Sequence, residues 1–223
     1  MVSRRRYDDP CGLARALDLI GERWALLVVR ELLHGPKRFT DLREGLPTAS
    51  QNVLSQRLRE LVEAGIVRRR KLAAPAASWV YELTQHGAAL EPALLALARW
   101  GSRTPLTSTA ELSVDALVLA LKTTFDARVA SDLRDRFELH LGEVVLHAEV
   151  GGGGFGIARG AAEGRDAVLE TTVTTLRSLV FGGAELADAI ARGTARVSGD
   201  EEALRRFLTL FPRPAVAPLS TSD

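Results

Sequence analysis

The sequence predicts an α+β protein of two domains, and three observations support this. Residues 11–103 carry apolar side chains mostly at the three- and four-residue spacing of helices. Residues 101–113 (GSRTPLTSTAELS) are rich in small polar residues and proline, which is typical of a linker or domain edge. Alternating, strand-like runs and helical stretches are mixed beyond this segment. We therefore expect one domain at 1–103 and an α+β domain at 104–223.

Length and composition agree with two ordinary globular domains. The chain has 223 residues, and 46% of them are hydrophobic while 26% are charged, so each half can build a core. The formal net charge is only +1, but residues 4–6 are all arginine and residues 68–71 read RRRK. Local basic clusters of this kind can bind phosphate even when the total charge is close to zero.

The cysteine count and the hydropathy bear on the compartment. Cys11 is the only cysteine in the sequence, so it cannot form an internal disulfide, and a reducing cytoplasm fits. No apolar run approaches the roughly 20 residues of a membrane span, and none follows the start as a signal peptide would require. We expect a cytoplasmic protein that does not contact membranes.

Four helices are expected before residue 66, broken at Gly21, at residues 34–36 and at Pro47, with Gly65 ending the fourth. Thr48 and Ser50 supply cap residues for the fourth helix. The expected apolar stripes are Leu13, Leu17 and Ile20; Trp24, Leu27, Val28 and Leu32; Phe39, Leu42 and Leu46; and Leu54, Leu58, Leu61 and Val62.

Two extended runs, 67–72 and 78–83, follow the fourth helix and predict a β-hairpin around 73–77. Thr84 is expected to cap a long helix after it. Three helices followed by a hairpin are typical of a winged helix-turn-helix, in which the last of the three helices enters the major groove of DNA. Here that last helix is the fourth one. The hairpin, or wing, then lies along the phosphate backbone.

The side chains opposite the apolar stripe of the fourth helix suit this role. Asparagine and glutamine can hydrogen-bond adenine, arginine can pair with guanine, and serine can meet phosphate. A merely solvated helix face carries the same residue types, so the hairpin decides between the two readings: four adjacent cations repel one another unless a polyanion compensates them. The residues predicted to contact double-stranded DNA are Arg38, Thr40, Ser50, Gln51, Asn52, Ser55, Gln56, Arg59, Arg68, Arg69, Arg70 and Lys71.

Residues 11–101 resemble the HxlR family of winged-helix regulators. The matching stretches, in order, are Cys11, 17–24 (LDLIGERW), 32–42 (LLHGPKRFTDL), 54–61 (LSQRLREL) and 81–84 (YELT). The resemblance implies a homodimer, built through the terminal helices of this domain, that recognises a short inverted repeat. The dimer contacts would be the N-terminal helix together with Leu90, Leu94, Leu97 and Trp100. The alternative is that these four residues only cover the core of one monomer.

Cys11 lies where the family commonly has a cysteine, which some members use to sense oxidants or electrophiles. The alternative is a small, half-buried residue without a chemical role. Arg4, Arg5 and Arg6 could lower its pKa or could form a solvated tail.

The second half is expected to contain a helix at 113–127 and a hairpin around Gly142. Its remaining elements are expected at 155–159 and 166–171 (strands), 173–181 and 184–191 (helices), 194–198 (strand) and 201–211 (helix).

This half resembles the small α+β domain of sterol carrier proteins, most clearly in residues 188–200 (DAIARGTARVSGD). The resemblance implies that the sheet and helices enclose an apolar ligand tunnel. The residues that would line either a core or such a pocket are Phe137, Leu139, Leu141, Leu146 and Phe155.

Several kinds of site are not expected. His34, His86, His140 and His147 lack metal-ligand spacing, although His140 and His147 could face each other across the hairpin. Residues 151–154 (GGGG) lack the Lys-Ser/Thr of a phosphate loop, and no nucleophile motif occurs. We therefore expect no catalytic residue, metal or cofactor. The sequence predicts a DNA-binding regulator controlled by a small apolar ligand; the alternative is a lipid- or ligand-sequestering protein with a vestigial DNA-binding domain.

Overall fold

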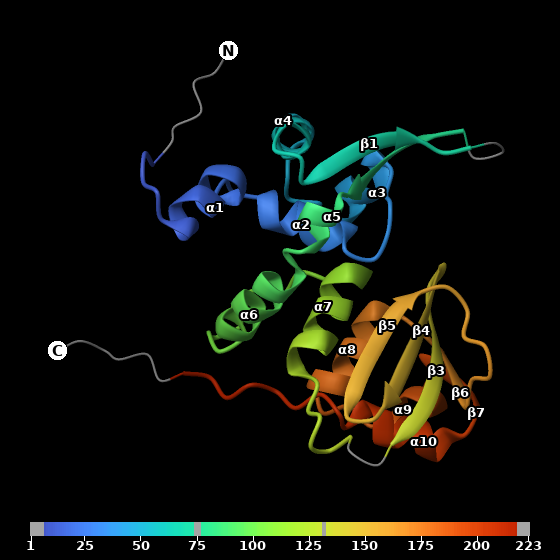
Figure 1. The fold of residues 1–223 in the computed structure, drawn as a ribbon. Coiled ribbons are helices and arrows are strands. Elements are labelled where there is room, and N and C mark those ends of the chain that lie inside the picture. Colours follow the sequence, from blue (N-terminus) through green and yellow to red (C-terminus); the bar gives the residue numbers. More distant parts are fainter. Residues whose placement is uncertain (1–6, 74–76, 131–132, 218–223) are drawn as a thin grey trace. The chain divides into compact units, whose positions relative to one another are not determined.

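The computed structural model describes residues 7–73, 77–130 and 133–217. The chain divides into two units, 1–94 (unit 1) and 95–223 (unit 2), and the division falls within one helix (Figure 1). Each unit has its own apolar core. The expected domain boundary at residues 103 and 104 stays a prediction.

Unit 1 follows the expected order of helices and hairpin. Four helices come first, then two antiparallel strands, then a short helix and a longer one that runs on into unit 2. The elements are α1 (Gly12–Ile20), α2 (Ala25–Leu32), α3 (Phe39–Gly45), α4 (Gln51–Glu63), β1 (Val67–Lys71), β2 (Trp79–Leu83), α5 (Gln85–Ala88) and α6 (Glu91–Gly101).

The core of unit 1 forms where the apolar stripes of α2, α3 and α4 meet. Val28, Leu42, Leu54 and Leu61 are completely buried there, because helical spacing places such residues on one side of each helix. The expected stripes were too wide in places. Leu27 and Val62 are 39% exposed. In α1 only Ala14 is buried; Ile20 packs against the core from a half-buried position, whereas Leu13 and Leu17 are exposed.

The single long helix expected after Thr84 is instead two helices, α5 and α6. The Thr84 hydroxyl caps α5 by accepting a hydrogen bond from the backbone N–H of Gly87 at 3.1 Å. The break before α6 has a clear cause in Pro92, which lacks an N–H and disfavours helical conformation in the preceding residue. Proline is tolerated in the first turn of a helix, so α6 starts there.

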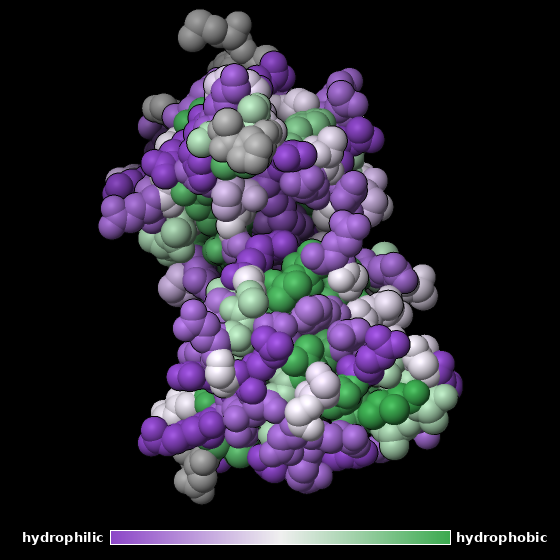
Figure 2. Space-filling model, turned by 90° about the vertical axis from the view of Figure 1, so that its right-hand side faces the viewer, coloured by the Kyte–Doolittle hydropathy of each residue, from purple (hydrophilic) through white to green (hydrophobic). Residues whose placement is uncertain are grey.

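The wing consists of β1 and β2, paired so that Arg68 lies opposite Glu82 and Arg69 opposite Tyr81. The backbone of Lys37 adds two hydrogen bonds to Tyr81, of 2.9 and 2.8 Å, and so ties the wing to the segment before α3. Seen from the side on which the wing ends, unit 1 presents mainly hydrophilic side chains (Figure 2).

Unit 2 is a five-stranded sheet with helices, in the strand order β5-β4-β3-β6-β7. The pair β3 and β6 is parallel, and the other pairs are antiparallel. The elements are α7 (Val114–Thr124), β3 (Arg134–Leu141), β4 (Val144–Gly151), β5 (Gly154–Arg159), β6 (Ala167–Thr171), α8 (Val173–Phe181), α9 (Leu186–Ala191), β7 (Ala195–Gly199) and α10 (Glu201–Leu208).

The helices of unit 2 cover one face of this sheet (Figure 1). Alternate residues of β3, such as Phe137 and Leu139, point into the core, because successive strand side chains point to opposite faces. The Phe137 ring meets Phe207 of α10 with 4.5 Å between ring centroids. No helix in the described part of the chain is long and apolar enough to cross a membrane.

Candidate nucleic-acid interface

The N-terminus of α4 is fixed by Ser50, whose hydroxyl accepts a hydrogen bond from the backbone N–H of Val53 at 3.3 Å. Ser50 thus acts as the cap that its position in the sequence predicted. The cap places Gln51 and Asn52 in the first turn, where both are exposed. Ser55 lies one residue after the buried Leu54 and is half-buried.

A chain of hydrogen bonds runs along the next two turns of α4. Arg59 Nη2 donates to Gln56 Oε1 at 2.6 Å, and Gln56 Nε2 donates to Glu60 Oε1 at 2.7 Å. Arg57 pairs with the other oxygen of Glu60. Arg57 and Glu60 were not among the predicted site residues, although spacings of three and four residues on a helix are the signal for such pairs. The chain holds the Gln56 and Arg59 side chains together at the surface of α4.

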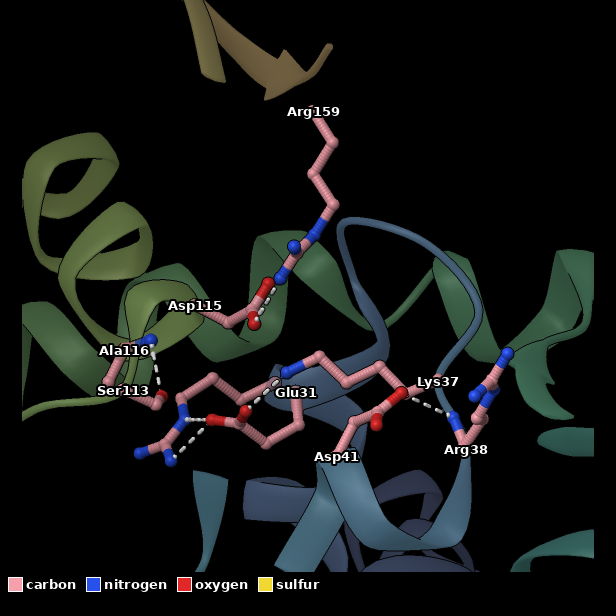
Figure 3. Close-up of polar contacts among 9 residues, drawn as sticks. Glu31, Lys37, Arg38, Asp41, Ser113, Asp115, Ala116 and Arg159 are labelled. Atoms are coloured by element: carbon pink, nitrogen blue, oxygen red, sulfur yellow. Dashed lines mark hydrogen bonds and ion pairs between the residues drawn. The ribbon is translucent and has the colours of Figure 1, made fainter. Parts of the chain in front are cut away.

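The first turn of α3 presents Arg38 and Thr40, and both are exposed. The Asp41 carboxylate orients this turn: it accepts a hydrogen bond from the backbone N–H of Arg38 at 2.9 Å (Figure 3) and one from the Thr40 hydroxyl at 3.2 Å. These two bonds fix the backbone of Arg38 and the hydroxyl of Thr40 at the start of α3.

A buried carboxylate, Glu31, lies beneath this surface. Lys37 Nζ is 2.6 Å from one of its oxygens and Arg30 Nη2 is 2.8 Å from the other (Figure 3). A Cβ atom on Gly45 would lie only 2.1 Å from Glu31 Oε2, so a larger residue at the end of α3 would force this ion-paired carboxylate or the helix end to shift. The carboxylate therefore joins α2 to the segment that carries Arg38. The sequence offered one signal for it, an acidic residue within an otherwise apolar helix stripe.

On the wing, Glu82 pairs with two of the four cations. Its carboxylate lies 2.6 Å from Arg68 Nε and 2.8 Å from Arg70 Nε. Partial burial raises the pKa of Glu82, but the hydrogen bonds from Arg70 and Arg68 outweigh burial and hold this pKa below its usual value. The expectation that all four cations need an external polyanion is therefore wrong for Arg68 and Arg70, because the cross-strand register brings a carboxylate between them.

Arg69 and Lys71 lie on the other face of β1. The Arg69 guanidinium stacks over the Trp79 ring at 4.5 Å and lies 5.9 Å from the Tyr81 ring. Lys71 lies opposite Trp79, which is 51% exposed. This face, which we call the stacked face, combines two cations with an exposed indole. Trp79 was not among the predicted site residues. Its position opposite Lys71 in the hairpin is the one signal that would have placed it beside the wing cations.

Cys11 is exposed and precedes the first turn of α1. The backbone N–H groups of Leu13 and Ala14 lower the pKa of its thiol, because they favour the thiolate. The three arginines that could act on this thiol, residues 4–6, lie outside the described residues.

The four residues predicted at the dimer interface divide into two groups. Leu94 is buried in the core of unit 1 and Leu90 packs against that core, whereas Leu97 is 50% and Trp100 70% exposed. The alternative that all four cover a single monomer's core therefore fails for Leu97 and Trp100.

The residues predicted to line either a core or a pocket in unit 2 pack as core. Phe137, Leu139, Leu141 and Leu146 are at most 4% exposed, and Phe155 packs against them and lies at the rim of a surface cavity. The two histidines of the hairpin do not face each other: His147 lies opposite Glu138, which binds His140 Nε2 at 2.8 Å. No cluster that could hold a metal ion occurs among the described residues.

Comparisons with known proteins found a family and several relatives that are similar to the N-terminal part of the chain. The model of the family "HxlR-like helix-turn-helix" matches residues 19–107. Two regulators of Bacillus subtilis are similar over 88 residues, or 40% of this chain: the uncharacterised HTH-type transcriptional regulator YvaP, at 38% identity over 82% of its length, and the HTH-type transcriptional regulator YodB, at 36% over 79%.

A solved structure of reduced YodB from the same bacterium matches 42% of this chain and 92% of that one, at 35% identity and a TM-score of 0.38. The similar proteins are named as transcriptional regulators rather than as enzymes. With a relative of 38% identity covered over most of its length, the family is established. The chain belongs to the family of HxlR-like helix-turn-helix transcriptional regulators.

Proposed function

We propose that this DNA-binding regulator reads one specific operator, an inverted repeat, as a homodimer. The observation that carries the proposal is the pairing of two surfaces in unit 1. One is the polar side of α4, with the exposed Asn52 and Arg59 and the half-buried Gln56. The other is the stacked face of the wing with Arg69 and Lys71.

The two surfaces suit different parts of DNA. Side-chain amides and a guanidinium on a helix can read base edges in the major groove, whereas cations on a hairpin contact the phosphate backbone without sequence preference. The Arg69 guanidinium is already held by two rings, so less side-chain entropy is lost when it meets a phosphate. Ser50, Gln51, Ser55, Arg38 and Thr40 would contribute contacts around the same groove.

The proposed dimer rests on uncovered apolar surface. α1 leaves Leu13 68% and Leu17 39% exposed, and α6 leaves Leu97 and Trp100 exposed. Apolar surface of this kind is favourable to cover, at about 25 cal/mol for each Å². A two-fold dimer that places its α4 helices about 34 Å apart would match successive major grooves, which calls for an inverted repeat.

We further propose that unit 2, with its resemblance to sterol carrier proteins, binds a small apolar ligand that changes DNA affinity. A ligand can regulate only if it binds the DNA-competent and DNA-incompetent states with different affinity. A winged helix needs no additional sheet domain for DNA binding itself, which favours a separate role for unit 2.

The experiment is a footprint of the full chain on the region upstream of its own gene, followed by light scattering of the complex on the protected fragment. We expect one protected inverted repeat and two chains for each duplex. Uniform protection at all sequences, or one chain for each site, would contradict the proposal.

A further inference from the structure

A cavity of about 510 Å³ lies in unit 2 between α7, α8 and two segments without regular structure. Residues 101–108 form one rim of the cavity, and Arg213, Pro214 and Val216 form the opposite rim. The backbone N–H of Ala217 donates to the carbonyl of Arg103 at 2.9 Å, so the two rims are joined at one end. The volume is within the roughly 300–1,000 Å³ of small-molecule sites.

The wall of this cavity is apolar. Phe181 of α8 and Leu112 pack against the unit 2 core with one side and line the cavity with the other. Leu106 and Val216 on the rims are 72% and 57% exposed, although residues of this type usually lie inside. Two exposed apolar side chains that border the same cavity mark a surface that an apolar ligand would cover.

The charged side chains that line the cavity are all basic. Its lining includes two arginines, Arg177 of α8 and Arg213, and no acidic residue. Within the described part of the chain neither guanidinium has an ion pair or hydrogen-bond partner, and Arg177 is half-buried. Another cavity of unit 2, at Arg134 and Phe155, has the carboxylates of Asp135, Glu149 and Asp166 in its lining. The arginine cavity is therefore better suited to an anion than this second cavity.

We propose that this cavity binds a single-chain amphiphile with an anionic head group, of the type of a long-chain carboxylate. The planar guanidinium can bind a carboxylate through two parallel hydrogen bonds, and the chain would lie against Phe181, Leu106 and Val216. This proposal rests on the ligand control proposed for unit 2 and gives it a site. That site is distinct from the Phe137–Leu146 core, which is packed.

The position of the cavity suggests how binding could reach the DNA-binding unit. Gly101, the last residue of α6, lines the cavity, and the same helix contributes Leu94 to the core of unit 1. A ligand held by residues 101–108 would restrict the segment that directly follows α6. Its effect on DNA affinity is thus transmitted along one continuous helix.

The test is isothermal titration of the full-length protein with dodecanoate below its micellar concentration, and with dodecanol as the neutral probe of equal chain length. We expect saturable binding of dodecanoate, and at least tenfold weaker binding of dodecanol. Arg177→Gln combined with Arg213→Gln should weaken dodecanoate binding at least tenfold and leave dodecanol binding unchanged. Arg192→Gln, an exposed arginine outside the cavity, is the matched control and should change neither.

A second pair of variants tests the apolar wall without disturbing a core. Leu106→Asp adds a negative charge at the rim and should abolish dodecanoate binding, whereas Val129→Asp, at a residue 54% exposed and outside the cavity, should not. The proposal is overturned if dodecanoate does not bind, or if the arginine and Leu106 variants bind it as the wild type does. DNA binding measured on the same samples separates this failure from failure of the proposed function, since unit 1 contains the residues that contact DNA.

Discussion

The carboxylate of Glu82 lies 2.6 Å from Nε of Arg68, directly across the wing from it. The same carboxylate also holds Arg70, so the wing carries a fixed negative charge among its cations. A protein that binds DNA through this hairpin must either keep that charge near the phosphates or turn it away from them. The pairing therefore sets how many wing cations are available to DNA.

Replacing Glu82 with glutamine should strengthen binding to all DNA sequences, because it frees Arg68 and Arg70 for phosphates. Each additional phosphate contact steepens the plot of log affinity against log salt concentration by about 0.9. Fluorescence anisotropy with a random duplex at several salt concentrations measures this slope. Glu202→Gln, at an exposed residue of α10, is the control, and an equal change in both variants would refute the assignment.

The low pKa of Glu82 gives this pairing a defined pH range. Because its pKa in the folded protein lies below the ordinary value, its ion pairs persist from neutral pH down through the ordinary carboxyl range and are lost only below it. The difference in DNA affinity between the wild type and Glu82→Gln should therefore stay constant between pH 6 and pH 8. A difference that shrinks within this range would contradict the pairing.

Leu97→Glu or Trp100→Glu should convert the proposed dimer to a monomer, because each places a charge on apolar surface that the partner would cover. Both residues are at least half exposed, so each monomer should keep its fold, as circular dichroism can verify. Light scattering at micromolar concentration measures the mass. Val129→Glu, at an exposed residue outside α6, is the control. If the Leu97→Glu and Trp100→Glu variants remain dimers, this surface is not the dimer interface.

The Cys11 thiol should react with iodoacetamide faster in the folded protein than in urea at neutral pH. The fold lowers its pKa through the N–H groups of Leu13 and Ala14, so a larger fraction is thiolate, which is the nucleophile. The rate should level off at a lower pH in the folded protein than in the denatured one. Equal profiles would show that α1 does not activate the thiol.

Gly45→Ala should lower the free energy of unfolding by about 1–3 kcal/mol, the usual cost of overpacking. The added Cβ would meet the Glu31 carboxylate, which is buried and ion-paired and cannot easily move. Gly12→Ala, where a Cβ would meet nothing within 4 Å, is the control. Urea unfolding of the two variants gives the comparison, and a stable Gly45→Ala would mean that Glu31 is free to shift.

Patterns along one element were enough to predict much of this fold. The stripe of Leu54, Leu58 and Leu61, with Ser50 before it, predicts α4 and its exposed side because helix periodicity and capping are local. Alternation predicts the hairpins of both units for the same reason. Pro92 also indicates the division of α5 from α6, although one long helix was expected there.

The missed features depend on contacts between elements. Glu31 meets Gly45 only after α2 and α3 pack, and Glu82 meets Arg68 only after the strand register is set. Trp24 takes a left-handed conformation with φ of 80° before α2, which no local preference of tryptophan indicates. The arginine cavity likewise forms from segments far apart in the sequence, and only the packed structure decides that Phe137, Leu139, Leu141 and Leu146, which the sequence left between core and pocket, are core.

We expect α4 to recognise the DNA sequence, while the wing supplies affinity without sequence preference. Anisotropy titrations with the operator and with a scrambled duplex of equal length test it directly, using Gln56→Ala with Arg59→Ala and, separately, Arg69→Ala with Lys71→Ala. The α4 variant should lose about 1–3 kcal/mol on the operator alone. The wing variant should weaken both duplexes alike and flatten the salt slope by about two. If the α4 variant loses equal affinity for both duplexes, α4 does not recognise the DNA sequence.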